Sequence, residues 1–407
     1  MKIKILSLIL CFIGVTAFSQ NMSYYTNEYM RGETFVQRLN TLQLVRNSET
    51  AGAGQFYHDA LKYLLLKTAD IRGNAAEQAA AERSLIILSQ GLGDEKYKAA
   101  AGDLWNAVEF FDVVKPGTSE GNAMQAALIA LAHVDGREFI PHIVKRLDDY
   151  NTQIFRNAET RRRYQTAVIG CINALETFKD ASGYRPVFFT SVGSYDPPIK
   201  QIASSALPNI TNDPANVLSA VIRDSSNTPD IKLEAWNQML RSKAPDQSKA
   251  RVAAVALATG WNYATSNRNF QTALSTMRKS AIEGIRQFGV SEDSVYINLD
   301  KSFSANFTAR SPDRDEIMVT LNALAAVKTD EAVVLLTKFT RETHERRLRD
   351  LWTDLEREIL QWLLSCISVT GTRSADVRYL LITIQRTEIY TPFEQGLARS
   401  ALTALGY

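Results

Sequence analysis

The sequence predicts an all-α protein in which about nine antiparallel helix pairs stack into an α-solenoid. Apolar residues recur at intervals of three and four through nearly all of the chain, which is the period of an α-helix with one buried face. Turn residues interrupt this pattern at intervals of 33 to 45 residues, a length typical of a helix pair. Glycine (20) and proline (11) are few among 407 residues, whereas a β-sandwich needs many tight turns.

Residues 1–19 have the composition of a secretory signal peptide. Lys2 and Lys4 form a short positive region, residues 5–17 are nearly all apolar, and small residues stand at Ala17 and Ser19. Cleavage is expected after Ser19. A membrane anchor is the alternative, but the apolar run is too short to cross a hydrocarbon core of about 30 Å. We therefore expect an exported protein, periplasmic or extracellular.

The charge balance changes when this segment is removed. The loss of its two lysines leaves 44 basic against 44 acidic residues. A neutral chain lacks the electrostatic attraction that dominates nucleic-acid binding, so no nucleic-acid partner is expected. No later segment offers about 20 uninterrupted apolar residues, so no transmembrane span is expected in the mature chain.

The three cysteines separate into two groups. Cys11 lies in the signal segment, where a lipoprotein cleavage site is disfavoured by the bulky Leu10. Cys171 and Cys366 stand on apolar helical stripes, 195 residues apart. We expect both to be small buried residues; a disulfide between them remains the alternative in an oxidising compartment.

The repeat region is expected to occupy residues 34–407, after an arm or capping helix over residues 20–33. Thr34 is a candidate N-cap, and the first helix follows as far as Asn47. Further helices are expected over residues 56–69, 75–88 and 97–111, the last two being separated by a turn at residues 91–94.

The best-defined pair covers residues 121–148. Asp135 and Gly136 break the pattern between two apolar stripes. Neither helix can bury its stripe alone, so the pair must stack on neighbours. The two stripes consist of Met124, Ala127, Leu128, Leu131 and Val134, and of Ile140, Ile143, Val144 and Leu147.

Turns recur along the rest of the chain. Together with a turn near Thr50, they give the count of about nine pairs. The candidate hairpin turns are Asp94, Asp135, Asp180, Asp213, Asp246, Ser291, Asp330 and Thr372.

Capping residues support several helix starts. Asp213 precedes Pro214, an N-cap followed by proline at the first helical position. Thr391 and Glu394 have the spacing of a capping box, and the helix that they begin is expected to close the stack.

Two regions depart from the repeat pattern. Residues 186–192 are rich in β-formers and residues 295–299 alternate like a strand, while residues 302–312 show no clear period. We expect irregular connections there, with a short strand possible. Residues 343–368, in contrast, contain no glycine or proline and predict the longest helix.

These features resemble the HEAT-repeat family, in which antiparallel helix pairs stack into a curved solenoid. The resemblance is clearest in residues 126–147 and next in residues 321–336, and it extends over residues 34–407. Tetratricopeptide repeats are the main competitor, but their strict 34-residue period is absent. The resemblance implies a scaffold that binds other proteins and implies no catalytic residue. The residues of 126–147 that occupy the family's places are Ala127, Leu128, Leu131, Asp135, Ile140, Pro141, Ile143, Val144 and Leu147.

The sequence carries few residues in patterns typical of catalysis, cofactor binding or metal binding. Neither a Gly-x-Ser-x-Gly elbow nor a phosphate-binding glycine loop occurs. His133 and His142 flank one turn with Asp135 between them, which allows a metal site, but solvated helix-end histidines are favoured. His344 and Glu345 lack the second histidine, four residues after the first, that a zincin helix needs. We predict a non-catalytic protein without a cofactor; the alternative, an exported enzyme or small-ligand receptor, would need a pocket with converging polar groups.

Two basic clusters, at residues 161–163 and 341–349, allow contact with an acidic partner or form solvated helix faces. In a HEAT-like stack the second helix of each pair lines the inner curve. Basic residues outside the apolar stripes of these helices are expected to point away from the core. There they form either a broken positive strip that attracts an acidic protein or ordinary solvated surface charge. The predicted partner-binding residues are Lys145, Arg146, Lys338, Arg341, Arg378 and Arg386.

Overall fold

The computed structural model describes residues 22–48, 52–67, 71, 74–113, 121–153, 157–349 and 353–407. Helices account for 80% of these residues, and none of them lies in a strand. The prediction of an all-α fold is therefore confirmed. The chain divides into two compact units, Met1–Thr211 and Asn212–Tyr407, which we describe separately.

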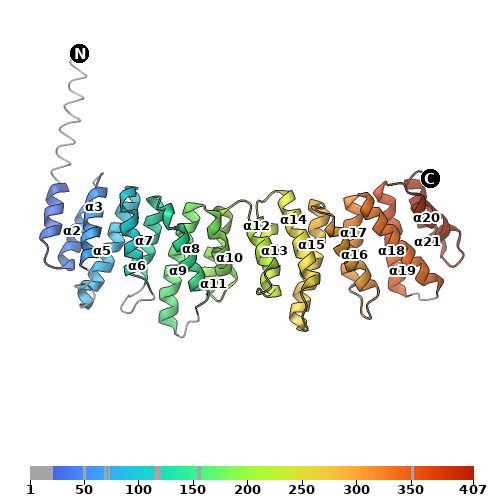
Figure 1. The fold of residues 1–407 in the computed structure, drawn as a ribbon, viewed down its shortest axis with the longest axis horizontal. Helices are drawn as coiled ribbons and strands as arrows, with labels where there is room; N and C mark the ends of the chain where they lie inside the picture. The colour runs from blue at the N-terminus through green and yellow to red at the C-terminus, as the bar shows by residue number, and fades with distance from the viewer. Residues whose placement is uncertain are drawn as a thin grey trace, which may run out of the picture. The chain divides into compact units, whose positions relative to one another are not determined.

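Unit 1 consists of two layers of helices (Figure 1). In the first layer α2, α5, α7, α9 and α11 pack one on the next, while in the second layer α3 packs on α6 and α8 on α10. Each second-layer helix also packs on the first-layer helix that follows it in the chain. The helices are α2 (Phe35–Asn47), α3 (Gly54–Leu66), α5 (Ala75–Asp94), α6 (Ala101–Phe110), α7 (Asn122–His133), α8 (Ile140–Asn151), α9 (Ala158–Phe178), α10 (Tyr184–Val192) and α11 (Pro197–Ile210).

Unit 2 has the same two-layer arrangement, and each layer is continuous from its first helix to its last. The first layer runs from α13 through α15, α17 and α19 to α21, and the second from α12 through α14, α16 and α18 to α20. Within each layer, neighbouring helices are in contact. The helices are α12 (Ala215–Arg223), α13 (Pro229–Arg241), α14 (Asp246–Asn262), α15 (Arg268–Phe288), α16 (Ser294–Phe307), α17 (Arg314–Val327), α18 (Asp330–Leu348), α19 (Asp354–Thr370), α20 (Ala375–Arg386) and α21 (Pro392–Ala404).

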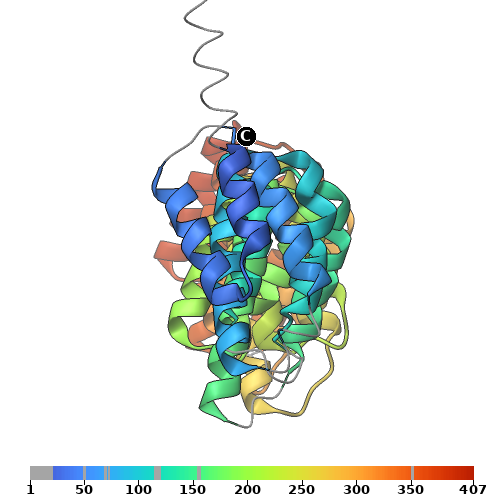
Figure 2. The same ribbon diagram turned by 90° about the vertical axis from the view of Figure 1, so that its left-hand side faces the viewer.

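The N-terminal end of unit 1 is covered by a further helix over residues 22–31. Tyr29 on this helix is completely buried, and its ring meets those of Phe56 and Tyr63 edge-on. Seen from that end, the nearest helices of the unit run side by side (Figure 2). Three short 3-10 turns precede α6, α8 and α10, namely η1 (Lys98–Ala100), η2 (Arg137–Phe139) and η3 (Ala181–Gly183).

Local capping chemistry determines where several helices begin. Thr34 accepts a hydrogen bond from the backbone N–H of Gln37, as predicted. Thr391 and Glu394 form the predicted capping box. Helix α12 begins one residue later than expected, because Asp213 accepts from the N–H of Ala215 at 3.1 Å and Pro214 takes the cap position.

The expectation of irregular structure was wrong for residues 186–192 and 295–307, whereas residues 308–312 do form an irregular connection. The first segment lies within α10 and the second within α16. Val187 and Phe188 of α10 are buried, as are Val295, Leu299 and Phe303 of α16. Burial of these side chains on neighbouring helices outweighs their preference for strands, which is itself a preference for half-buried surfaces.

The expectation of one long helix over residues 343–368 was also wrong. Helix α18 ends at Leu348, and Thr353 begins α19 with a capping box to Glu356. The longest helices are α9 and α15, with 21 residues each.

Residues 91–94 were expected to form a turn between two helices, but they form the last helical turn of α5. A β-carbon at position 91 would lie 2.4 Å from the ring of Tyr57, so Gly91 permits a close contact with α3 rather than a chain reversal.

The core contains the residues that the stripes predict. Leu131 and Ile143 are fully buried, whereas Val144 is only half-buried. Cys171 and Cys366 are buried free thiols, as expected of small core residues, and burial raises the pKa of each to about 12.

Two expectations, the signal peptide over residues 1–19 and the turn near Thr50, lie outside the described residues. In the part of the chain that is described, no helix combines the length and the apolar character needed to cross a membrane.

Candidate functional site

The six predicted partner-binding residues lie on three second-layer helices. Helix α8 of unit 1 carries Lys145 and Arg146, while α18 and α20 of unit 2 carry the other four. Because α18 packs directly on α20, the structure brings Lys338, Arg341 and the α20 residues onto one pair of neighbouring helices.

Arg146 does not point away from the core as expected. Its side chain is only 13% exposed, forms ion pairs with Glu109 and Asp112, and lies 5.2 Å from the centre of the Trp105 ring. The long arginine side chain reaches across to α6, where its charge is compensated and its aliphatic part is covered. Lys145 is exposed, as expected, and pairs with Asp149 at 2.7 Å.

The basic residues of α18 are partly neutralised. Lys338 contacts both carboxylate oxygens of Asp300 on α16 at 2.7 Å. Arg341 approaches Asp376 of α20 at 3.8 Å. These pairs connect α16, α18 and α20, so the cations also stabilise the second layer.

The two α20 arginines are exposed. The Arg378 guanidinium lies 5.6 Å from the centre of the Tyr407 ring, and Arg386 has no ion-pair partner among the described residues. In unit 2, Arg341, Arg378 and Arg386 are therefore the predicted residues whose charge is most available.

A groove between α18 and α20 contains two of the predicted residues. Its volume is about 320 Å³, and Val334 forms an exposed apolar part of its lining. Charged side chains of both signs surround it. The polar lining consists of Asp330, Thr337, Lys338, Arg341, Thr372, Arg373, Ser374 and Asp376.

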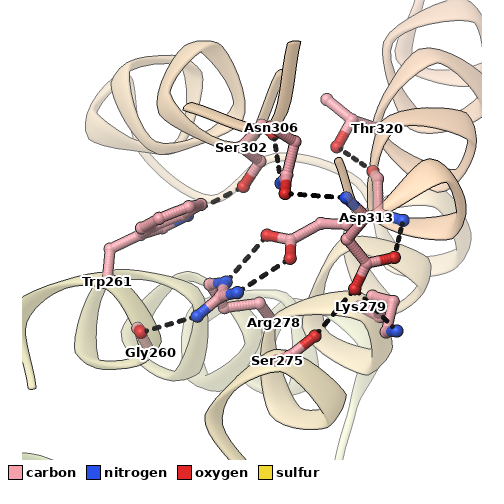
Figure 3. A network of polar contacts seen from close by, with 10 residues as sticks. Gly260, Trp261, Ser275, Arg278, Lys279, Ser302, Asn306, Asp313 and Thr320 are labelled. Atoms are coloured by element: carbon pink, nitrogen blue, oxygen red, sulfur yellow. Dashed lines mark hydrogen bonds and ion pairs between the residues drawn. The ribbon is translucent and has the colours of Figure 1, made fainter. Parts of the chain in front are cut away.

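The neighbouring helices α14 to α17 are connected by a polar network (Figure 3). Its centre is Glu316, a fully buried carboxylate that accepts two hydrogen bonds from Arg278, at 2.7 and 2.8 Å. Arg278 also donates to the Gly260 carbonyl at 3.1 Å, and its guanidinium stacks 4.1 Å from the Trp261 ring. Arg278 therefore has partners on α14 and α17. The cluster joins these helices to α15, which carries Arg278.

The same network continues on both sides of the ion pair. The indole N–H of Trp261 donates to Ser302 of α16 at 2.8 Å. Asp313, at the start of α17, accepts from Ser275 and Lys279 of α15, both at 3.0 Å, and these bonds help to lower its pKa. Each of these groups forms a hydrogen bond that joins one helix to another.

A buried lysine was missed in the sequence because nothing distinguishes it from a surface lysine. Lys232 of α13 is 1% exposed and donates to the carbonyls of Ile222, at 2.6 Å, and Asp224. It thereby caps the C-terminal end of α12, and burial lowers its pKa. A pocket of about 370 Å³ lies beside it, lined also by Arg223 and Tyr263.

The histidines occupy two kinds of environment. His133 and His142 are exposed, as expected. His58 and His344 are buried and hydrogen-bonded to Asp103 at 2.8 Å and to the Tyr390 hydroxyl at 2.6 Å. The described residues contain no group of three or more histidine, cysteine or acidic side chains that could hold a metal ion.

No protein-family model matches the chain, and no curated protein matches it.

Proposed function

We propose that this chain is an exported, non-catalytic, HEAT-like scaffold that binds another protein through the second-layer helices of unit 2. The observation that carries the proposal is the uniform two-layer packing of that unit, in which helices from α12 to α21 alternate between layers. A stack of this kind presents a long surface of parallel helices, a shape suited to binding a protein.

The exposed face of α18 and α20 supplies the chemistry for that contact. Arg341 offers positive charge in the lining of the groove, Arg378 and Arg386 offer further exposed positive charge on α20, and Val334 offers apolar area. Cations on a protein surface accelerate encounter with an acidic partner and select against basic ones. In this proposal Arg146 stabilises the packing of α8 on α6 and does not bind the partner.

Charge reversal tests the proposal. The substitutions Arg341→Glu, Arg378→Glu and Arg386→Glu, combined in one chain, are compared with Arg399→Glu, an exposed arginine on first-layer helix α21. Proteins cross-linked to each tagged variant in the cell envelope are quantified by mass spectrometry at two salt concentrations. A partner that is lost from the triple variant and kept by the control supports the proposal.

Equal recovery of every protein from both variants, with unchanged salt dependence, would exclude this face as the binding surface. Circular dichroism of the triple variant measures its helical content. This content should be unchanged, because the three arginines are exposed.

Export is tested independently of binding. Cleavage after Ser19 predicts a mature chain that begins at Gln20, which intact-mass measurement of protein recovered from cells would detect. Recovery of a chain that still begins at Met1 would contradict this part of the proposal.

A further inference from the structure

The pocket beside Lys232 lies where helix α12 ends. Helix α12 has 9 residues, whereas α14, which packs on it, has 17. Arg223, the last residue of α12, lines the pocket together with residues from the second half of α14. The shorter helix therefore leaves this half of α14 open. The volume of about 370 Å³ is near the lower end of the range for small-molecule sites, about 300–1,000 Å³.

Helix α14 supplies the apolar part of the pocket. Ala254, Val255 and Ala258 line it, and the two alanines have little side-chain volume with which to fill the space. Tyr263, directly after α14, adds its ring to the lining. An apolar group of a small ligand can therefore be buried against α14.

Two positive charges lie on the side of the pocket that α12 and α13 form. Arg223 is exposed and has no ion-pair partner among the described residues. Lys232 is buried, and two of its three N–H bonds donate to the carbonyls of Ile222 and Asp224. Its Nζ is 5.6 Å from the centre of the Tyr263 ring, which itself lines the pocket. The buried charge therefore lies beside the cavity.

A carboxylate in the pocket would compensate this charge. Among the described residues no carboxylate forms an ion pair with Lys232, and burial lowers the pKa of its amine. An anionic group nearby favours the ammonium form and offsets the cost of burying it. The guanidinium of Arg223 can in addition bind a carboxylate with two parallel hydrogen bonds.

The opposite charge lies across the pocket. Glu292 is exposed in the connection between α15 and α16, and α14 lies between α12 and α16 in the second layer. The carboxylate of Glu292 accepts from the Ser294 hydroxyl at 2.8 Å. It forms no ion pair with Arg223 or Lys232 in the described part of the chain, so the two signs of charge remain apart. A ligand ammonium can therefore bind at this side.

We propose that this pocket binds a small zwitterion, namely a free amino acid or a dipeptide with apolar side chains. Its carboxylate pairs with Arg223 beside the Lys232 ammonium, and its ammonium pairs with Glu292. Its apolar side chain packs on the alanines of α14. The pocket shares no lining residue with the groove between α18 and α20, so this inference does not depend on the proposed function.

Isothermal titration calorimetry on the purified protein tests the inference. The probes are leucine and leucyl-leucine, each also in two blocked forms. The N-acetylated form lacks the ammonium and the C-terminal amide lacks the carboxylate. At least one free probe should bind, and both of its blocked forms should bind about tenfold more weakly or worse, because each loses a charge-assisted contact. Binding of leucine identifies a free amino acid, and binding of leucyl-leucine alone identifies a dipeptide.

Substitutions at exposed positions assign the two charged contacts. Arg223→Gln and Glu292→Gln each remove one charge from the pocket and should weaken binding of the free probe by about tenfold or more. The matched controls are Arg241→Gln on α13 and Asp293→Asn beside Glu292. Both residues are exposed and neither lines the pocket, so the affinity should be unchanged.

Three results would overturn the inference. They are no binding of either free probe, equally tight binding of a blocked form, and an affinity that neither pocket variant lowers more than its control. The outcome of the envelope cross-linking experiment has no bearing on these measurements, because it concerns α18 and α20.

Discussion

Each of two buried charged side chains in this protein, Glu316 and Lys232, has its own set of polar partners. Glu316 is fully buried, and Arg278, 14% exposed, supplies both of the hydrogen bonds to its carboxylate. Lys232 is satisfied by two carbonyls at the end of α12. Such groups are costly to bury alone, so Glu316 depends on an arginine 38 residues away in the sequence, and Lys232 depends on two carbonyls at the end of the preceding helix.

Removing Arg278 is expected to be strongly destabilising. The variant Arg278→Ala leaves Glu316 as an uncompensated buried carboxylate, a change that costs about 3–5 kcal/mol. Hydrogen exchange of α15 and α17 amides under native conditions measures the loss. As a control, Arg241→Ala removes an arginine that is 64% exposed and paired with Glu234, and it should have little effect. If both variants changed hydrogen exchange by a similar, small amount, the buried pair would not be a main source of stability in these helices.

His344 is expected to make unit 2 less stable in mild acid. Burial lowers its pKa below the usual 6.5. The unfolded chain therefore takes up a proton near pH 6.5, whereas the folded chain does so only at lower pH, and the difference favours unfolding as the pH falls below 6.5.

Denaturant unfolding at pH 7.5 and 5.5 checks this expectation. The stability lost between the two values should be smaller in His344→Gln than in the unmodified chain, because the variant cannot titrate there. Equal losses would show that other groups cause the acid sensitivity.

Helix boundaries in this protein depend on side-chain caps as much as on apolar periodicity. Thr353 and Glu356 separate α18 from α19 within a stretch that contains neither glycine nor proline. Thr391 and Glu394 begin α21 in the same manner. A threonine three residues before a glutamate marks both starts in the sequence.

Truncating a cap should loosen a single helix. Thr391→Ala removes the acceptor for the Glu394 N–H and should cost about 1 kcal/mol. Faster hydrogen exchange confined to the first turn of α21 is the expected result. Ser400→Ala, at an exposed position within the same helix, should not accelerate exchange. Unchanged exchange in Thr391→Ala would mean that packing alone fixes the start of α21.

At the scale of the whole molecule, stability is distributed along the layers. Helix α7 packs on α5, α6 and α9, and its contacts lie within unit 1. In a stacked array each element depends mainly on its neighbours, so a defect in one place should be felt locally.

Core truncation tests this locality. Leu131→Ala and Ile143→Ala each remove a fully buried side chain, at a cost of about 2–5 kcal/mol. Hydrogen exchange should rise in α5 to α9 and remain unchanged in unit 2. A uniform rise along all the described helices would indicate one cooperative core instead.

The sequence by itself determined the all-α class, most turns and most of the core. Apolar residues repeat with the helical period whether or not their partners are known, so Leu131 and Ile143 could be placed in the core. The same local reasoning found the caps at Thr34 and Thr391.

Only the tertiary structure decided which polar residues are buried and which apolar ones are exposed. Arg146 resembles a surface residue until α6 supplies its carboxylates, and Val334 resembles a core residue until α16 and α20 leave it uncovered. Residues 186–192 likewise become helical because neighbouring helices bury Val187 and Phe188. Contacts between residues more than 30 positions apart carry these decisions, and local periodicity contains no information about them.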